Sequence, residues 1–94
     1  MKIVGIIWLE EIVDKLLRKH AVQTFEVKEV FNNSPIFRLV EKGHQKGENL
    51  YAALGQTNAG RYLIVFFIYK QNRKALIISA RNMDNAERKT YQRK

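Results

Sequence analysis

The first third of the chain places its hydrophobic residues mainly at helical spacing. Residues 3–8 form a short apolar run, which predicts a strand or an extended lead-in. Apolar residues then recur three and four positions apart, as on one face of an amphipathic helix of about three turns. They are Leu9, Ile12, Val13, Leu16 and Leu17. A second, shorter helix is predicted from Thr24, which can cap it, and it ends before Pro35, which disfavours helical geometry in the residue before it.

From residue 36 the pattern changes to that of strands. Residues 36–41, 50–56, 61–69 and 75–80 are hydrophobic runs, separated by a glycine-containing loop at 42–49 and by turn signals at 57–60 and 71–73. The run 61–69 is apolar on both faces, so we expect it at the centre of the sheet, covered on both sides, with its aromatic residues in the core. Residues 84–93 have the pattern of a polar helix, in which Asp84 and Glu87 are spaced as an N-cap and its partner.

This order of elements predicts an α+β fold with the helices packed on one face of the sheet. We expect two N-terminal helices packed on a four-stranded, mainly antiparallel sheet, followed by a basic C-terminal helix. Residues 1–94 are expected to form one domain, because two domains in so short a chain would each be too small to bury a useful core.

The composition excludes several classes of protein. There is no cysteine, which excludes disulfides, cysteine zinc sites, iron–sulfur clusters and thiol nucleophiles, and suits a reducing cytoplasm. The longest apolar run, 62–69, is less than half a membrane span. Acidic residues follow the apolar N-terminus too soon for a signal peptide. We therefore expect a soluble, cytoplasmic protein with no membrane partner.

The positive charge is concentrated near the C-terminus. The formal net charge is +8 at pH 7, and residues 70–94 hold eight of the 17 basic side chains but two of the nine acidic ones. Such a field favours a polyanion, a membrane surface or an acidic protein. No glycine-rich phosphate loop or nucleophile elbow is present, and His20 and His44 have no acidic residue placed to complete a metal site. We expect no cofactor and no metal.

A set of short motifs follows in order along nearly the whole chain. They are Lys-His-Ala-Val at 19–22, Val-Lys-Glu-Val-Phe at 27–31, Tyr-Ala-Ala-Leu-Gly-Gln-Thr at 51–57, Gly-Arg at 60–61, Ile-Ser-Ala-Arg at 78–81 and Glu-Arg-Lys-Thr-Tyr at 87–91. The chain thus resembles the BrnT family of type II toxin–antitoxin ribonuclease toxins, which have a RelE-like fold. Its first helix departs from the family pattern, because Ile12 and Leu16 stand where the family has Lys and Asn, and Ala21 replaces a family Gly. The chain is accordingly identified as a member of a divergent branch.

The resemblance implies a ribonuclease that cleaves RNA without a metal ion and inhibits translation until an antitoxin neutralises it. The partners that it implies are RNA and a cognate DNA-binding antitoxin of the ribbon–helix–helix type, in a hetero-oligomer. The alternative is a non-catalytic module that uses the same basic C-terminal face to bind RNA or an antitoxin. Binding of RNA by such a module should weaken steeply with salt.

Five residues are candidates for catalysis. Metal-free cleavage requires activation of the ribose 2′-OH, stabilisation of charge on the phosphorane and protonation of the leaving oxygen. Arg61 and Arg81 suit the second task, because a guanidinium contacts phosphate bidentately. Arg61 begins one strand and Arg81 ends the next, so a hairpin would bring these strand ends together. His20 and Glu87 are candidates for proton transfer, and Tyr91 for proton transfer or base stacking.

Each candidate also has a purely structural alternative. The two arginines can be ordinary surface or loop charges, His20 a packed residue of the first helix, Glu87 part of a capping pair, and Tyr91 a residue packed on the sheet edge. Four further cations are expected to attract the RNA backbone. They are Lys70, Arg73 and Lys74 around a turn and Arg88 in the last helix.

Overall fold

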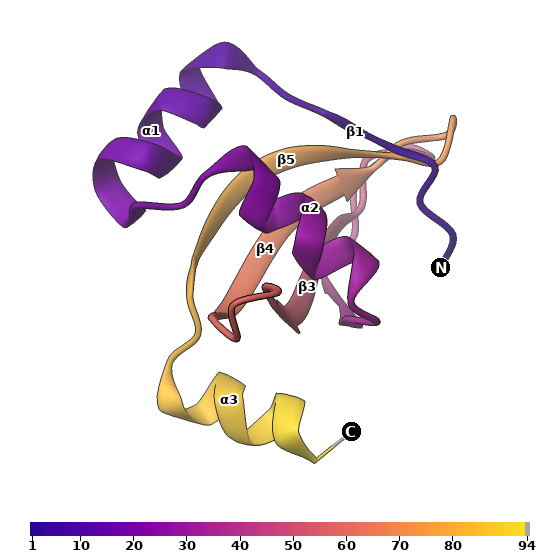
Figure 1. Cartoon of the computed structure of the whole chain (residues 1–94). Helices are drawn as coiled ribbons and strands as arrows, with labels where there is room; N and C mark the ends of the chain where they lie inside the picture. The colour runs from indigo at the N-terminus through magenta and orange to yellow at the C-terminus, as the bar shows by residue number, and fades with distance from the viewer. Residues whose placement is uncertain (94) are drawn as a thin grey trace.

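The computed structural model describes residues 1–93 and shows an α+β fold in which three helices surround one five-stranded sheet (Figure 1). The helices are α1 (Glu10–His20), α2 (Thr24–Asn32) and α3 (Asn85–Gln92). The strands are β1 (Gly5–Ile7), β2 (Ile36–Glu41), β3 (Leu50–Gln56), β4 (Tyr62–Tyr69) and β5 (Lys74–Asn82). The sequence pattern therefore predicted every element, with shifts of one or two residues at several ends.

The sheet has one strand more than expected. Its order is β1-β5-β4-β3-β2, with antiparallel pairing from β2 to β5 and β4 at the centre, as predicted. The N-terminal run adds a fifth strand, because β1 pairs in parallel with β5 and sets Ile6 opposite Ala75. The expected strand number of four was wrong, whereas the mainly antiparallel pairing is confirmed; the pairing of β1 lets Ile6 pack against the core.

The inner face of the sheet, which carries Ala53, Leu63, Val65 and Phe67, holds the larger core. Here α2 lies across β3 and β4, while α1 packs beside β5 (Figure 1). Leu16 of α1 and Val27 and Val30 of α2 are buried against these strands. The apolar stripes from which α1 and α2 were predicted are thus the faces through which the two helices pack against the sheet.

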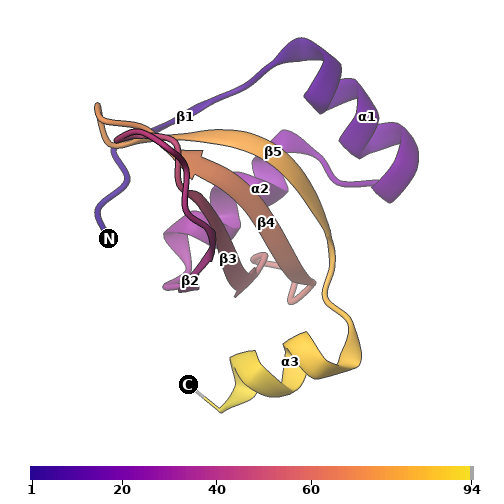
Figure 2. The same ribbon diagram turned by 180° about the vertical axis from the view of Figure 1, so that it is seen from behind.

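The outer face, which carries Ala52, Leu54, Ile64 and Phe66, has much less cover. Of the three helices, α3 alone packs there, at one end of the sheet (Figure 2). Tyr91 is the single buried residue of α3. Beyond α3 the face is open, so Phe66 is half-buried. The expectations that β4 is covered on both sides and that all helices pack on one face were wrong, because an eight-residue helix with one buried side chain covers little area.

Helix ends follow local chemistry. Asp84 and Glu87 form the predicted reciprocal pair at the start of α3, since each side chain accepts a backbone N–H of the other at 2.8 to 2.9 Å. The cap predicted for α2 was wrong by one residue. The N-cap is Gln23 rather than Thr24, and the Glu26 carboxylate accepts the Gln23 N–H at 3.0 Å. Within residues 1–93, no helix is long and apolar enough to cross a membrane.

Candidate functional site

Polar and aromatic side chains share the open part of the outer face. Strand register places Arg38 of β2 opposite Ala52, Ala52 opposite Phe66, and Phe66 opposite Ser79 of β5. The neighbouring row ends at Arg81, which pairs with Ile64. Because side chains two residues apart on a strand share a face, Arg38, Phe66 and Arg81 lie on one surface. Sequence reasoning missed Arg38, whose signal was a single cation between the apolar residues of β2.

Arg81 is held in place by Glu87. Its two terminal nitrogens donate to the two carboxylate oxygens at 2.8 and 2.9 Å, and one of them also donates to the Asn82 carbonyl. The guanidinium carbon lies 5.6 Å from the centroid of the Phe66 ring. The Arg81 side chain nevertheless remains 37% exposed. The arrangement therefore presents a fixed cation over an aromatic ring at the surface.

The electrostatic environment of Glu87 suits a residue that holds Arg81 in place better than a general base. The hydrogen bonds from Arg81 are the largest cause that lowers the pKa of Glu87, and Asp84 and Arg38 lower it further against the opposing effect of burial. A carboxylate with a lowered pKa is a weak proton acceptor. The bond between the Asp84 N–H and Glu87 also places Glu87 in the capping pair that was its structural alternative. A catalytic role for Glu87 stays a prediction that this geometry does not favour.

Tyr62 and Arg88 extend the same surface towards α3. The Arg88 guanidinium carbon lies 4.2 Å from the Tyr62 ring centroid. Hydrogen bonds from Gln92 and then Arg88 lower the pKa of the Tyr62 hydroxyl. Tyr91 is 6% exposed, and its ring meets Tyr62 edge-on at 6.0 Å. Tyr91 therefore supports Tyr62, which sequence reasoning had placed in the core.

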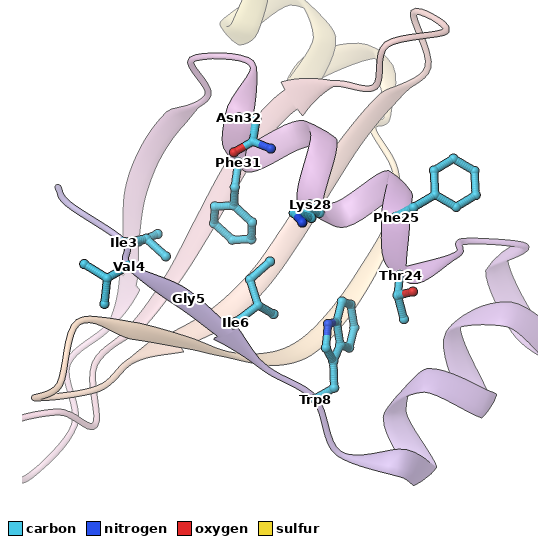
Figure 3. A pocket seen from close by; sticks show the side chains of 10 residues that line it. All are labelled: Ile3, Val4, Gly5, Ile6, Trp8, Thr24, Phe25, Lys28, Phe31 and Asn32. Atoms are coloured by element: carbon cyan, nitrogen blue, oxygen red, sulfur yellow. The ribbon is translucent and has the colours of Figure 1, made fainter.

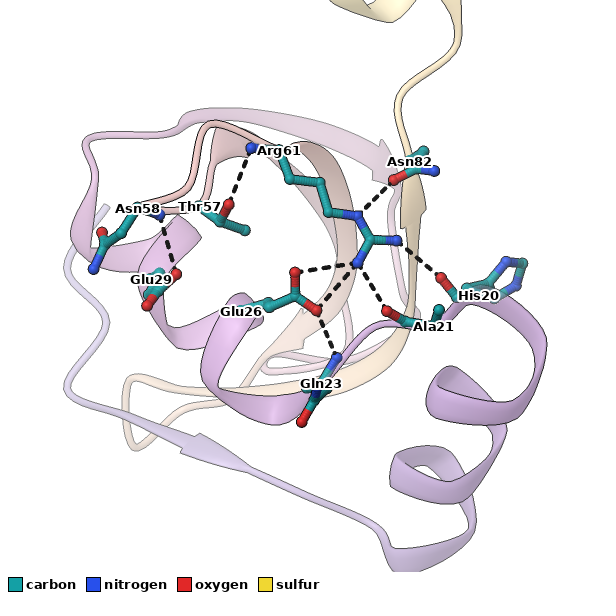
Figure 4. A network of polar contacts seen from close by, with 9 residues as sticks. All are labelled: His20, Ala21, Gln23, Glu26, Glu29, Thr57, Asn58, Arg61 and Asn82. Atoms are coloured by element: carbon teal, nitrogen blue, oxygen red, sulfur yellow. Dashed lines mark hydrogen bonds and ion pairs between the residues drawn. The ribbon is translucent and has the colours of Figure 1, made fainter.

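Arg61 lies in a dense network on the inner side of the sheet (Figure 4). Its Nε donates to Asn82 at 2.8 Å, and its terminal nitrogens donate to the carbonyls of His20 and Ala21 at 2.9 and 2.8 Å. One terminal nitrogen also lies 3.1 Å from both oxygens of Glu26. Four of the five guanidinium N–H groups thus bind the protein itself. The geometry favours a positioning role for Arg61, because it joins the end of α1 to α2 and β5.

The structure brings the two arginine-bearing strand ends together, as the hairpin predicted, but sends the side chains to opposite faces. Arg61 contacts the N-terminal helices, whereas Arg81 contacts α3. A bulge in β5 explains this separation. Phe67 pairs with Ile77 but Phe66 pairs with Ser79, so one extra residue shifts the following pairs and sets Arg81 opposite Ile64 on the outer face.

The remaining candidates also lie away from Arg81. His20 ends α1, and its imidazole points away from the Arg61 network (Figure 4). Lys70, Arg73 and Lys74 surround the β4–β5 turn, at the other end of the hairpin from α3. An eight-residue strand separates the two ends by roughly 25 Å. The cations of residues 70–93 therefore form two groups rather than one patch.

A groove of about 570 Å³ lies between β1 and α2 (Figure 3). Its walls are mostly apolar, with Ile6, Trp8 and Phe31 pointing into it, and Lys28 is its one charged lining residue. Such a groove lacks the several cations that a polyanion requires. The outer face instead combines Arg38, Arg81 and Arg88 with aromatic rings, which suits single-stranded nucleic acid. Among residues 1–93, no group of three or more His, Asp or Glu side chains is arranged to hold a metal ion.

Comparisons with known proteins agree with this fold. A crystal structure of the Brucella abortus ribonuclease toxin BrnT superposes with a TM-score of 0.62 at 18% sequence identity. The match covers 86% of this chain and 97% of that one. No curated protein sequence matches the chain. The family model for the ribonuclease toxin BrnT of type II toxin–antitoxin systems matches residues 8–87. Because that match covers most of the chain, this protein belongs to the BrnT family of type II toxin–antitoxin ribonuclease toxins.

Proposed function

We propose that this protein cleaves single-stranded RNA on the outer face beside α3, without a metal ion, and thereby inhibits translation. The observation that carries the proposal is the Arg81 guanidinium, held over Phe66 by Glu87 and joined on the same face by Arg38. RNA is the substrate that membership of the family implies. The outer face offers cations for its phosphates and rings for its bases.

Arg81 has donors left for a phosphate. Three of its five N–H groups bind Glu87 and Asn82, and within residues 1–93 the Nε–H and one terminal N–H make no such contact. The Arg81 side chain is 37% exposed, so these two donors are open to a ligand, and Arg38 supplies a second positive charge on the same face. Attack of the ribose 2′-OH on phosphorus would place its developing charge against this pair, as electrostatic catalysis requires.

Tyr62 is the group best suited to protonate the leaving oxygen. Its hydroxyl carries a lowered pKa, so it releases a proton more readily than an ordinary tyrosine, and Arg88 stabilises the resulting phenolate. In this step the 2′-OH gives up its proton to water as its oxygen bonds to phosphorus, and the bond from phosphorus to the 5′-oxygen breaks. The 5′-oxygen takes the Tyr62 proton, and a 2′,3′-cyclic phosphate remains. Tyr62 is one residue from the Gly-Arg motif and remains half-buried on the outer face. No sequence motif marked it.

The family also implies an antitoxin partner. We propose that this partner is a ribbon–helix–helix protein that forms a hetero-oligomer with the toxin in the cytoplasm. The support is the family to which the chain belongs. Co-expression with the small reading frame beside the gene, followed by light scattering of the purified complex, tests the pairing and its stoichiometry. A toxin that purifies alone from this co-expression contradicts it.

Cleavage is tested with purified protein and end-labelled single-stranded RNA. We expect cleavage to persist in EDTA and to leave 2′,3′-cyclic phosphate ends. Arg81→Ala should lower the rate about 100-fold or more, while Lys15→Ala on the exposed side of α1 should not change it. Loss of wild-type cleavage in EDTA overturns metal independence. Tight RNA binding without any cleavage supports the non-catalytic module instead.

Translation inhibition has its own test. Induced expression without the antitoxin should stop incorporation of labelled amino acids within minutes, and Arg81→Ala should restore it. Melting temperatures of both proteins must be compared, because Arg81 also anchors α3. Continued protein synthesis in cells that contain folded wild-type toxin contradicts the proposal.

A further inference from the structure

A second hollow, of about 450 Å³, lies at the other end of the β4–β5 hairpin from α3. Three cations and two tyrosines line it: Lys46, Lys70, Arg73, Tyr51 and Tyr69. We infer that this hollow is a second RNA-binding subsite, which takes a phosphate and a base of single-stranded RNA outside the cleaved position. The inference rests on the proposed function for its choice of ligand and extends it to a site that the motifs did not mark.

The cations of the hollow are not neutralised by neighbouring acids. Glu41 and Glu48 flank the same loop, but they line a separate hollow together with Ile68 and Ile78. Among the described residues, neither Lys46 nor Arg73 forms an ion pair. At this end of the molecule the two glutamates and the three cations therefore line different hollows, which leaves the cations available for an anion.

The backbone of Arg73 is strained. Its φ is +64°, in the left-handed region that residues other than Gly and Asn rarely adopt. The Arg73 N–H donates to the Lys70 carbonyl at 2.9 Å, and the Lys70 N–H donates to the Lys74 carbonyl at 2.9 Å. This is a turn whose last position usually holds glycine. The turn thereby holds the Arg73 side chain in the lining of the hollow, at a position where glycine would supply no charge.

The two tyrosines form a fixed aromatic wall. Their rings meet edge-on at 6.3 Å, and Tyr51 also stacks on Phe67 at 5.9 Å. The Tyr69 hydroxyl donates to the Lys2 carbonyl, which holds that ring in place. The Gln71 amide donates to the Lys46 carbonyl at 3.2 Å and so ties the 42–49 loop to the hairpin. A rigid ring beside several cations is the combination that binds single-stranded nucleic acid irrespective of sequence.

The direct test is a comparison of RNA affinity and stability in Arg73→Gly. The probe is a fluorescent single strand of about ten nucleotides, 2′-O-methylated throughout so that it lacks the 2′-OH required for cleavage. Fluorescence anisotropy should show binding about fivefold weaker than wild type, with a salt slope reduced by about 0.7. The melting temperature should rise, because glycine relieves the strained backbone. If the role of Arg73 were purely structural, the substitution would lower the RNA affinity and the melting temperature together.

Two controls separate the contributions. Ala21→Gly relieves the same backbone strain at the end of α1, so it should raise the melting temperature and leave RNA binding unchanged. Lys15→Gln removes the same charge from an exposed helix surface, and it should leave the salt slope unchanged. Lys70→Gln should weaken binding in the same way as Arg73→Gly, because its ammonium lines the same hollow.

Each outcome decides one question. Wild-type RNA affinity in both Arg73→Gly and Lys70→Gln overturns the subsite, whether or not the wild type cleaves RNA. An equal loss in Lys15→Gln also overturns it, since net charge alone would then explain binding. Binding of polyglutamate as tight as that of RNA overturns the choice of ligand. If the wild type does not cleave RNA but Arg73→Gly still weakens binding, the proposed cleavage fails and the subsite stands.

Discussion

The Arg81 guanidinium and the Glu87 carboxylate form a two-pronged ion pair that joins the end of β5 to the first turn of α3. The same carboxylate accepts the Asp84 N–H and so completes the cap of that helix. Because Tyr91 is the only buried residue of α3, polar contacts carry much of its attachment to the sheet. The candidate site is therefore held together by charges that are themselves sensitive to pH.

Glu87→Gln should lower stability by about 1 kcal/mol at pH 7, since it removes the ion pair but keeps a side chain that can complete the cap. The folded-state pKa of Glu87 is lowered, so its stabilisation is present above the unfolded value and is lost as pH falls through the folded value. Urea denaturation at pH 7 and near pH 2.5 should show the gap between wild type and variant closing in acid. A stability difference that is as large in acid as at pH 7 contradicts the attribution to ionised Glu87. Glu48→Gln, in the exposed loop, is the control.

Arg61→Lys should destabilise the fold by about 2 kcal/mol, because an ammonium cannot replace the guanidinium fork between Glu26, His20 and Ala21. Arg18→Lys on the exposed side of α1 should have no effect. Urea denaturation measures both, and a double-mutant cycle with Glu26→Gln should show coupling. If Arg61→Lys keeps full stability but abolishes RNA cleavage, Arg61 is a catalytic residue rather than a positioning one.

Most elements of this fold were predictable because their hydrophobic residues form helical stripes or strand-length runs. The stripe that includes Leu16 defines α1, and the runs that include Leu54 and Phe67 define β3 and β4. The pairing of β1 was not predictable, since three residues are too few to show a period. The open outer face was not predictable either, because the apolar character of β4 indicates burial without showing what covers it.

The candidate site could be predicted only in part. The hairpin brings the ends near Arg61 and Arg81 together, and that follows from the sequence. The faces to which the two side chains point depend on the bulge at Ile78. Without it, the pairing of Phe67 with Ile77 would continue to put Arg81 opposite Leu63, on the same inner face as Arg61. No sequence pattern marks that one-residue shift.

Ala21→Gly should stabilise the protein by about 1 kcal/mol, or about 4–8 °C in melting temperature. Ala21 ends α1 in the left-handed conformation, with φ 52° and ψ 38°, and its N–H donates to the Leu17 carbonyl. Glycine adopts this geometry without steric cost, which fits its place in the family pattern. Ala86→Gly in α3 is a matched control with the opposite sign, since glycine inside a helix destabilises it. Two changes of the same sign in calorimetry would contradict this account.

Gly55→Ala should destabilise the protein by about 1–3 kcal/mol through overpacking. An added Cβ would lie 3.0 Å from Val30 Cγ1 and 3.2 Å from Pro35 Cβ, and Val30 is fully buried and has no room to move. Gly5→Ala is the control, because its Cβ would meet Lys74 at an ordinary 3.6 Å.

The clash at Gly55 has a second consequence, because α2 carries both Val30 and Glu26. Displacing α2 from β3 would also pull Glu26 away from Arg61. The destabilisation caused by Arg61→Lys should therefore be smaller in the Gly55→Ala background than in wild type. Fully additive free energies of unfolding would show instead that α2 accommodates the methyl group without moving, and that the close contact at Gly55 does not set the position of the helix.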